Sequence, residues 1–107
     1  MKIAIIGTGV YALATANKLS KTNNNIWMWT EKENVKEVIA PKGVIVSNKF
    51  EDVIKDSKVI FILVAGKFIK SVLDSMKDFI IGDELFVIGS KGIMDDGTLI
   101  YELIQDK

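Results

Sequence analysis

The fold is decided by one stretch of this sequence: KIAII at Lys2–Ile6, GTGVYA at Gly7–Ala12, and IWMW at Ile26–Trp29, with the acid Glu31 close behind. Lys2–Ile6 is an unbroken apolar run after its lysine, which is typical of a strand buried on both faces of a parallel sheet. The two glycines follow at once, and the residues after them are dense in apolar and alanine side chains. We therefore predict a strand, a glycine turn, a helix, a second strand and an acid, in that order.

Each part of this unit has its own role in holding a dinucleotide. Gly7 permits the tight turn out of the strand, and Gly9 has no side chain, so the backbone can approach a pyrophosphate. Ala12 is small enough to let the helix lie close to the strand. The start of the helix offers free N–H groups and the positive end of its dipole to the phosphates. Glu31 follows about 20 residues after the turn, where an acid can accept hydrogen bonds from the adenosine ribose.

The composition limits what this chain can do. Its 107 residues are typical of a single domain, so we expect residues 1–107 to form one dinucleotide-binding unit. The 14 basic and 14 acidic residues give no net charge, which argues against a nucleic-acid partner. Without cysteine or histidine there is no disulfide, no thiol chemistry and no imidazole ligand, and we predict no metal site. We also predict no signal peptide and no membrane span, which needs ~18 apolar residues, and hence a cytoplasmic location.

The rest of the chain alternates apolar runs with amphipathic segments. Further strands are predicted at Val44–Val46, Val59–Val64 and Leu85–Ile88. Helices are predicted at Val10–Lys21, Glu31–Ile39, Phe50–Ile54, Lys67–Phe79 and Thr98–Gln105. This alternation indicates an α/β fold, a Rossmann-type doubly wound parallel sheet in three α/β/α layers with strand order 3-2-1-4-5. The ligand should lie at the carboxyl ends of the first and fourth strands, where the strand order reverses.

Two further loops should end at that same crevice. One is Val64–Phe68, and the other is Gly89–Ile93, which contains Lys91 and overlaps a loop predicted at Ser90–Gly97. Lys91 stands between small residues just after a predicted buried strand, so its ammonium can hold an anionic substrate or a cofactor phosphate. Asp95 and Asp96 lack further ligands at useful spacing, and we interpret them as a turn and helix cap rather than a metal site.

Three segments together resemble the N-terminal domain of NAD-dependent glycerol-3-phosphate dehydrogenases. They are Gly7–Ala12, Val64–Phe68, and Ser90–Ile93 with the residues that follow it. The likeness runs in register over essentially the whole chain, and Ser-Lys-Gly-Ile at Ser90–Ile93 is its most discriminating part.

The resemblance implies roles for particular residues. The pyrophosphate would be cradled by Gly7, Gly9, Val10, Tyr11 and Ala12. Phe68 would lie against the nicotinamide, and Lys91 would contact both substrate and cofactor. The implied reaction is the reversible hydride transfer between NADH and dihydroxyacetone phosphate that gives glycerol 3-phosphate, a step of glycerophospholipid metabolism. The implied partners are therefore a dinucleotide and a small phosphorylated substrate.

The sequence also departs from that family. Ala12 stands where a glycine is usual, and Ala65-Gly66 replaces a proline-containing loop. Glu31 repels a 2′-phosphate, which favours NAD over NADP. The family's helical second domain, with its catalytic lysine, would follow Lys107. We therefore expect the chain to bind the cofactor and to be catalytically incomplete by itself.

Other functions stay open at this stage. The chain could come from a related dehydrogenase, such as a ketopantoate reductase or a nucleotide-sugar dehydrogenase, whose first turns look similar. It could also be a non-catalytic NAD(H) sensor or a remnant that acts by binding alone. Assembly into a homodimer is a further expectation that the sequence does not settle.

Overall fold

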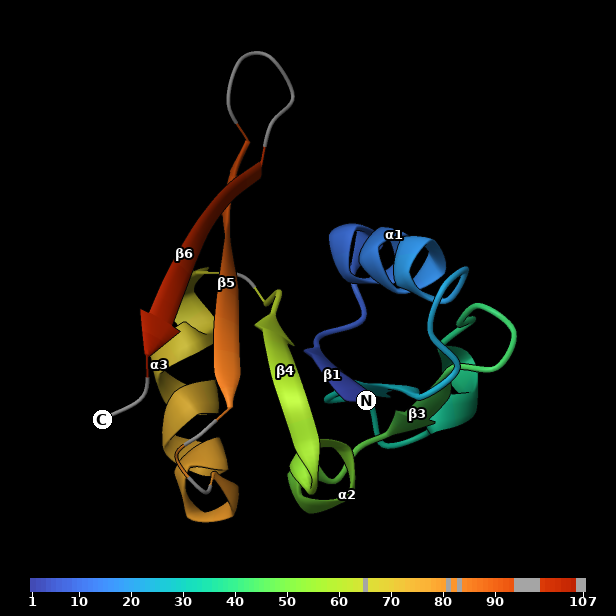
Figure 1. Ribbon diagram of the computed structural model, residues 1–107, viewed down its shortest axis with the longest axis horizontal. Coiled ribbons are helices and arrows are strands. Elements are labelled where there is room, and N and C mark those ends of the chain that lie inside the picture. Colours follow the sequence, from blue (N-terminus) through green and yellow to red (C-terminus); the bar gives the residue numbers. More distant parts are fainter. Residues whose placement is uncertain (65, 81, 83, 94–98, 106–107) are drawn as a thin grey trace.

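The sheet at the centre of the molecule has the predicted order. The structure is a computed structural model that describes residues 1–64, 66–80, 82, 84–93 and 99–105, with the backbone alone for 66–69, 88–93 and 99–105 (Figure 1). Its strands are β1 (Lys2–Ile6), β2 (Ile26–Trp29), β3 (Ile45–Ser47), β4 (Ser57–Ile62), β5 (Leu85–Ile93) and β6 (Leu99–Gln105). They lie in the order β3-β2-β1-β4-β5-β6, and the first five pair in parallel, which confirms the doubly wound fold.

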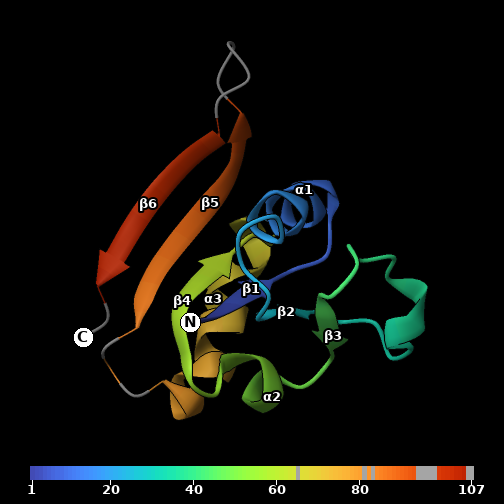
Figure 2. The same ribbon diagram turned by 45° about the vertical axis from the view of Figure 1, so that its right-hand side comes forward.

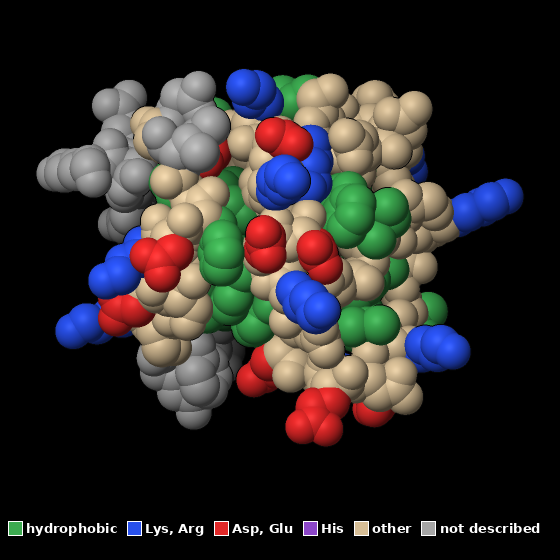
Figure 3. All heavy atoms as spheres, turned by 90° about the horizontal axis from the view of Figure 1, so that it is seen from below, with side chains coloured by type: hydrophobic (Ala, Val, Ile, Leu, Met, Phe, Trp, Pro, Cys, Tyr) green, Lys and Arg blue, Asp and Glu red, His purple; other side chains and the backbone are tan. Residues whose placement is uncertain are grey.

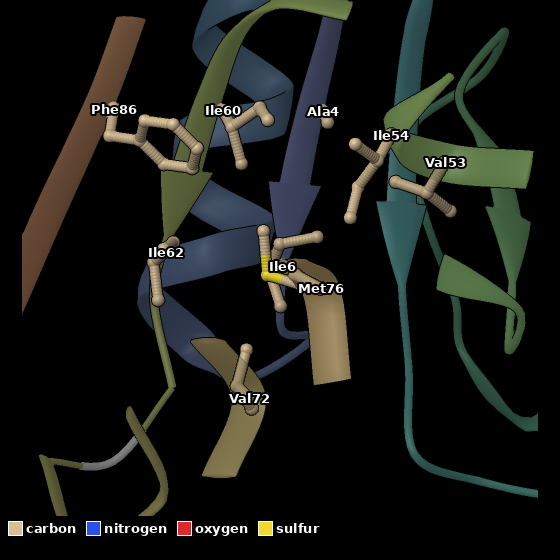
Figure 4. Close-up of a cluster of buried hydrophobic side chains, with 9 residues drawn as sticks. All are labelled: Ala4, Ile6, Val53, Ile54, Ile60, Ile62, Val72, Met76 and Phe86. Carbon is tan, nitrogen blue, oxygen red and sulfur yellow. The ribbon is translucent and has the colours of Figure 1, made fainter. Parts of the chain in front are cut away.

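Helices cover both faces of the sheet, as Figures 1 and 2 show. They are α1 (Val10–Leu19), α2 (Phe50–Ile54) and α3 (Gly66–Met76), with short 3₁₀ turns at Val35–Glu37 and Lys77–Phe79. Successive residues of a strand point to opposite faces, so Ile3 and Ile5 of β1 pack with α1. Ala4 and Ile6 pack on the other side, against α2 and α3 (Figure 4). The two clusters establish the predicted three layers.

The end of the described chain differs from the sequence-based prediction. We expected a loop from Ser90 to Gly97 and a helix at Thr98–Gln105. Instead β5 continues to Ile93, and Leu99–Gln105 forms β6, which pairs with β5 in antiparallel register. A short apolar run fits a buried helix and a strand equally well by pattern alone. Pairing with the free edge of β5 supplies backbone hydrogen-bond partners that favour the strand.

The helix expected at Glu31–Ile39 is also absent from the described structure. Only the 3₁₀ turn Val35–Glu37 forms there, and the Asn34 side chain accepts a hydrogen bond from the Lys36 N–H at its start. Such a side-chain bond offers the backbone an alternative to a helix. Ile39 is 87% exposed, so this side chain, which the predicted helix would have turned inward, does not anchor the segment.

Lys2, at the start of β1, connects the amino-terminal end of that strand to α2. Its Nζ donates to the backbone oxygens of Asp52 and Lys55, each at 2.7 Å, and lies 4.5 Å from the centroid of the Trp27 ring. Burial lowers the pKa of Lys2, an effect that the charges of Asp56 and Asp52 partly offset. Figure 3 views the molecule from the end where α2 lies, and acidic and basic side chains are interspersed there without a large patch of one sign. None of the described helices is long and apolar enough to cross a membrane.

Candidate functional site

Three strands end side by side at the opposite end from Lys2. In the sheet register Ile6 of β1 lies between Trp29 of β2 and Ile62 of β4. The ladders continue beyond the strands, because the Gly7 N–H donates to the Trp29 carbonyl and the Leu63 N–H to the Ile6 carbonyl, both at 2.9 Å. The turns that follow the three strands are therefore held together at the point where the strand order reverses.

A cleft of about 420 Å³ opens at this point. Its lining comes from the glycine turn, the segment after β2, the end of β4 and one face of α3. The residues are Gly7, Thr8, Gly9, Trp29, Glu31, Lys32, Leu63, Val64, Ser71 and Val72. Binding clefts for cofactors usually have about this volume or more, and this one lies where the doubly wound fold predicts the ligand.

Gly7 brings the turn against the end of β4. Its φ is +123°, a conformation that residues with a side chain rarely adopt. A Cβ at this position would lie 2.7 Å from the Leu63 carbonyl oxygen and 3.4 Å from a methyl group of Val64. The predicted need for glycine at this turn is thus explained by backbone conformation and by a close contact, and both are structural.

Gly9 has the opposite environment. It is exposed, has an ordinary φ of −74°, and a Cβ placed on it would meet no atom within 4 Å. It is also the N-cap of α1, and no side chain accepts a hydrogen bond from the N–H groups there. Nothing in the part of the chain that the structure describes therefore requires glycine at this position. What the bare backbone provides is access for a group from solvent.

The first turn of α1 suits an anion. It contains no acidic residue, and its backbone N–H groups carry the positive end of the helix dipole. Ala12 is fully buried against the sheet, in agreement with the expectation that a small residue lets the helix approach. Val10 is 79% exposed and Tyr11 39% exposed, so both side chains stand at the surface beside the turn.

Thr30 is a residue that the sequence analysis missed. Its side chain is 1% exposed and lies between the glycine turn and the segment that carries Glu31. The Thr8 hydroxyl donates to Thr30 Oγ1 at 3.1 Å, and the Lys32 N–H donates to the same oxygen at 3.2 Å. Glu31 and Lys32 are both exposed at the rim of the cleft. The predicted ribose-binding acid is therefore on the same cleft as the predicted diphosphate turn.

Trp29, the last residue of β2, lines the cleft on the side that packs against α2. Its ring stacks on Phe50 with the centroids 4.1 Å apart, and its indole N–H donates to the Asn48 carbonyl at 3.1 Å. The sequence analysis placed this tryptophan at the end of a predicted strand. It does lie there, and besides lining the cleft it packs against a buried apolar cluster.

Two predicted site residues have side chains outside the described part of the structure. Phe68 belongs to α3, which begins at Gly66, and it lies within the helix predicted at Lys67–Phe79. Lys91 belongs to β5 rather than to the expected loop. Asp95 and Asp96 lie outside the described residues altogether. Among the residues that are described, no group of three or more Asp or Glu is placed to hold a metal ion.

Comparison with known families decides what the domain is. The family model described as the N-terminus of NAD-dependent glycerol-3-phosphate dehydrogenase matches residues 2–107. The chain belongs to this family. The cofactor that the family's description names is NAD, and its members are oxidoreductases.

The curated relatives are longer than this chain. A glycerol-3-phosphate dehydrogenase [NAD(P)+] of Fusobacterium nucleatum is 26% identical over 110 residues, which cover 90% of this chain and 33% of that enzyme. An enzyme of the same name from Bacillus anthracis is 26% identical over 122 residues, covering 99% of this chain and 36% of the relative. The chain thus spans about a third of the length of the relatives it matches.

Solved structures share the fold. A glycerol-3-phosphate dehydrogenase from Coxiella burnetii superposes with a TM-score of 0.77 at 21% identity, covering 91% of this chain and 34% of that one. A ketopantoate reductase from Ralstonia eutropha gives a TM-score of 0.74 at 15% identity, covering 87% and 35%. Because both activities occur on this fold, the structural likeness alone does not choose between them.

Proposed function

We propose that this chain binds NAD(H) in the cleft at the ends of β1, β2 and β4, as the cofactor-binding part of a glycerol-3-phosphate dehydrogenase. The observation that carries the proposal is the contrast at the two glycines. Gly7 is required by the fold, whereas Gly9 faces open space at the uncapped start of α1. A bare backbone and free N–H groups at that place are what a diphosphate needs.

The residues around the cleft divide the binding between them. The N–H groups at the start of α1 would hold the diphosphate, and the Glu31 carboxylate would accept hydrogen bonds from the adenosine ribose. When bound, NADH supplies a hydride to the carbonyl carbon of dihydroxyacetone phosphate, and with one proton the products are NAD⁺ and glycerol 3-phosphate. In this proposal Phe68 lies against the nicotinamide and Lys91 contacts both substrate and cofactor.

Glu31 also supports a preference for NAD over NADP. A carboxylate at the rim of the cleft repels the 2′-phosphate that distinguishes NADP. Lys32 lies next to it on the same rim, and its ammonium opposes that effect. We propose that Glu31 dominates because an acid at this position binds the two ribose hydroxyls directly, while a lysine offers only an exposed and mobile charge.

Catalysis needs more than this domain. Positioning the phosphorylated substrate and stabilising charge on its carbonyl oxygen require groups that converge from several directions. Since the chain spans about a third of its relatives, we propose that it binds NADH but turns over dihydroxyacetone phosphate slowly or not at all. The cytoplasmic location and the homodimer stay predictions, and the molar mass from light scattering tests the second.

The binding proposal is tested by titrating the chain with NADH while following its tryptophan fluorescence. Gly9→Ala puts a methyl group where the diphosphate should approach, and a contact of that kind costs about 1 to 3 kcal/mol, or roughly 5- to 150-fold in Kd. Ala14→Ser is the matched control, because it adds one atom to the exposed side of the same helix. The proposal requires saturable NADH binding that weakens in Gly9→Ala and is unchanged in Ala14→Ser. Equal affinities in all three proteins, or no saturable binding in the unmodified chain, would overturn it.

The alternatives give different results. A non-catalytic sensor should bind NADH and change its oligomeric state or a partner contact when it does so, which light scattering would detect. A remnant should show no saturable binding. A ketopantoate-reductase-like protein would bind the same cofactor, so a substrate panel on the full-length enzyme separates it.

A further inference from the structure

The Thr30 hydroxyl lies at the junction of the two segments that the proposed function uses. Thr30 follows the last residue of β2, and its backbone N–H donates to the Ser47 carbonyl of β3 at 3.0 Å. Its side chain is buried, yet it is not part of either apolar cluster. A buried hydroxyl is costly unless it is hydrogen-bonded, so its contacts explain its presence there.

Those contacts tie Glu31 in place. Thr30 Oγ1 accepts the Lys32 N–H at 3.2 Å, which closes a tight side-chain turn around the residue between them. Glu31 is therefore held between a backbone bond of Thr30 to β3 on one side and the side-chain bond to Lys32 on the other. The Glu31 side chain is exposed, so this turn restrains its backbone.

The same oxygen also contacts the glycine turn. Thr8 lines the cleft between the two glycines, and its hydroxyl donates to Thr30 Oγ1 at 3.1 Å. A hydroxyl has one rotatable proton and two acceptor sites, so this pair can reverse its direction. Thr30 then donates to Thr8, and the Thr8 proton becomes available to an anionic oxygen in the cleft.

We propose that Thr30 is a positioning residue that couples the diphosphate turn to the ribose-binding acid. Through Thr8 it makes a hydroxyl donor available at the turn, and through Lys32 it fixes the position of Glu31. The inference rests on the proposed function and adds a determinant of coenzyme preference that neither glycine nor Glu31 supplies alone. Its consequence is that a change at Thr30 alters both the affinity for NADH and the discrimination against NADPH.

The experiment compares Kd values for NADH and NADPH across variants of the chain. Thr30→Val keeps the shape and removes the hydroxyl, and Thr30→Ser keeps the hydroxyl. We expect Thr30→Val to weaken NADH binding by about tenfold, because the Thr8 hydroxyl is then no longer directed as a donor to a charged phosphate oxygen. We expect it also to reduce the preference for NADH over NADPH at least threefold. Thr30→Ser should restore both values to within about twofold of the unmodified chain.

A merely structural role for Thr30 gives a different pattern. Thr30→Val would then lower the thermal stability, while the Kd values for NADH and NADPH changed by the same factor. An unchanged ratio of these two Kd values overturns the inference. If Thr30→Val does not fold, Thr8→Val carries the test from the other partner of the pair. It leaves the Thr30–Lys32 bond intact, so it should weaken the binding of NADH and NADPH by a similar factor, and unchanged NADH binding overturns the inference. If the unmodified chain binds no NADH, the proposed function fails first, so the two failures are distinguishable.

Discussion

Replacing Gly7 by alanine should destabilise the domain far more than the same change at Gly9, Gly43 or Gly82. The positive φ of +123° costs about 1 to 3 kcal/mol for a residue with a side chain. In addition, the new Cβ would lie 2.7 Å from the Leu63 carbonyl oxygen, which is backbone and cannot rotate away. Forcing that contact apart adds about 1 to 3 kcal/mol. The sum of about 2 to 6 kcal/mol is a large fraction of the stability of a small domain, which is about 5 to 15 kcal/mol.

Gly82→Ala is the matched control for this change. Gly82 also has a positive φ, +107°, but a Cβ on it would meet nothing within 4 Å. The two variants share the strain and the reduced freedom of the unfolded chain, so their difference isolates the contact with Leu63. Thermal unfolding followed by circular dichroism should give a midpoint at least about 5 °C lower for Gly7→Ala than for Gly82→Ala. Equal midpoints would refute the claim that the turn is pressed against the end of β4.

Two further predictions follow from the walls and the rim of the cleft. Phe50→Ala removes the ring that stacks on Trp29, and we expect urea denaturation to show that the free energy of unfolding falls by about 2 to 3 kcal/mol. A fall below about 0.5 kcal/mol would mean that the stack contributes little. Glu31→Gln removes the charge at the rim, and we expect calorimetry to show tighter NADPH binding with NADH binding weakened, while Lys32→Gln should weaken NADPH alone. A Glu31→Gln protein with an unaltered coenzyme ratio would contradict the role given to that carboxylate.

The apolar patterns at the start of the chain predicted structure closely. Lys2–Ile6 and Ile26–Trp29 were predicted as strands with the bounds that the structure has. Both runs are bordered by residues that stop a strand: the glycine turn after the first, and Asn23–Asn25 before the second. Where no such residues border the run, the predicted bounds were displaced. The strand β4 was expected at Val59–Val64 and lies at Ser57–Ile62.

The two errors have different physical causes. Leu99–Gln105 is apolar enough for either a helix or a strand, and the choice depends on the edge of β5, which is a tertiary feature. At Glu31–Ile39 the β-branched residues and the Asn34 side-chain bond oppose a helix. The only pattern in favour of a helix there is the helical spacing of a few apolar residues.

The candidate site was predicted in part. Gly7, Gly9 and Glu31 line one cleft, as the motif implies, because its spacing reflects neighbouring parallel strands, and Ala12 is buried between α1 and the sheet. Thr30 was missed, since its hydroxyl partner Thr8 is 22 residues away and no local pattern reveals the pair. A signal did exist: Thr30 directly follows one predicted strand and Thr8 lies two residues after its predicted neighbour, so their side chains could have been expected to meet.

A crystal structure of the chain grown with NADH would test the central claim most directly. The account predicts the diphosphate at the start of α1, with its oxygens accepting hydrogen bonds from backbone N–H groups near Gly9 and Val10, and the adenosine ribose beside Glu31. A coenzyme bound elsewhere on the chain, or a cleft still empty of coenzyme at a concentration that saturates the fluorescence titration, would contradict it.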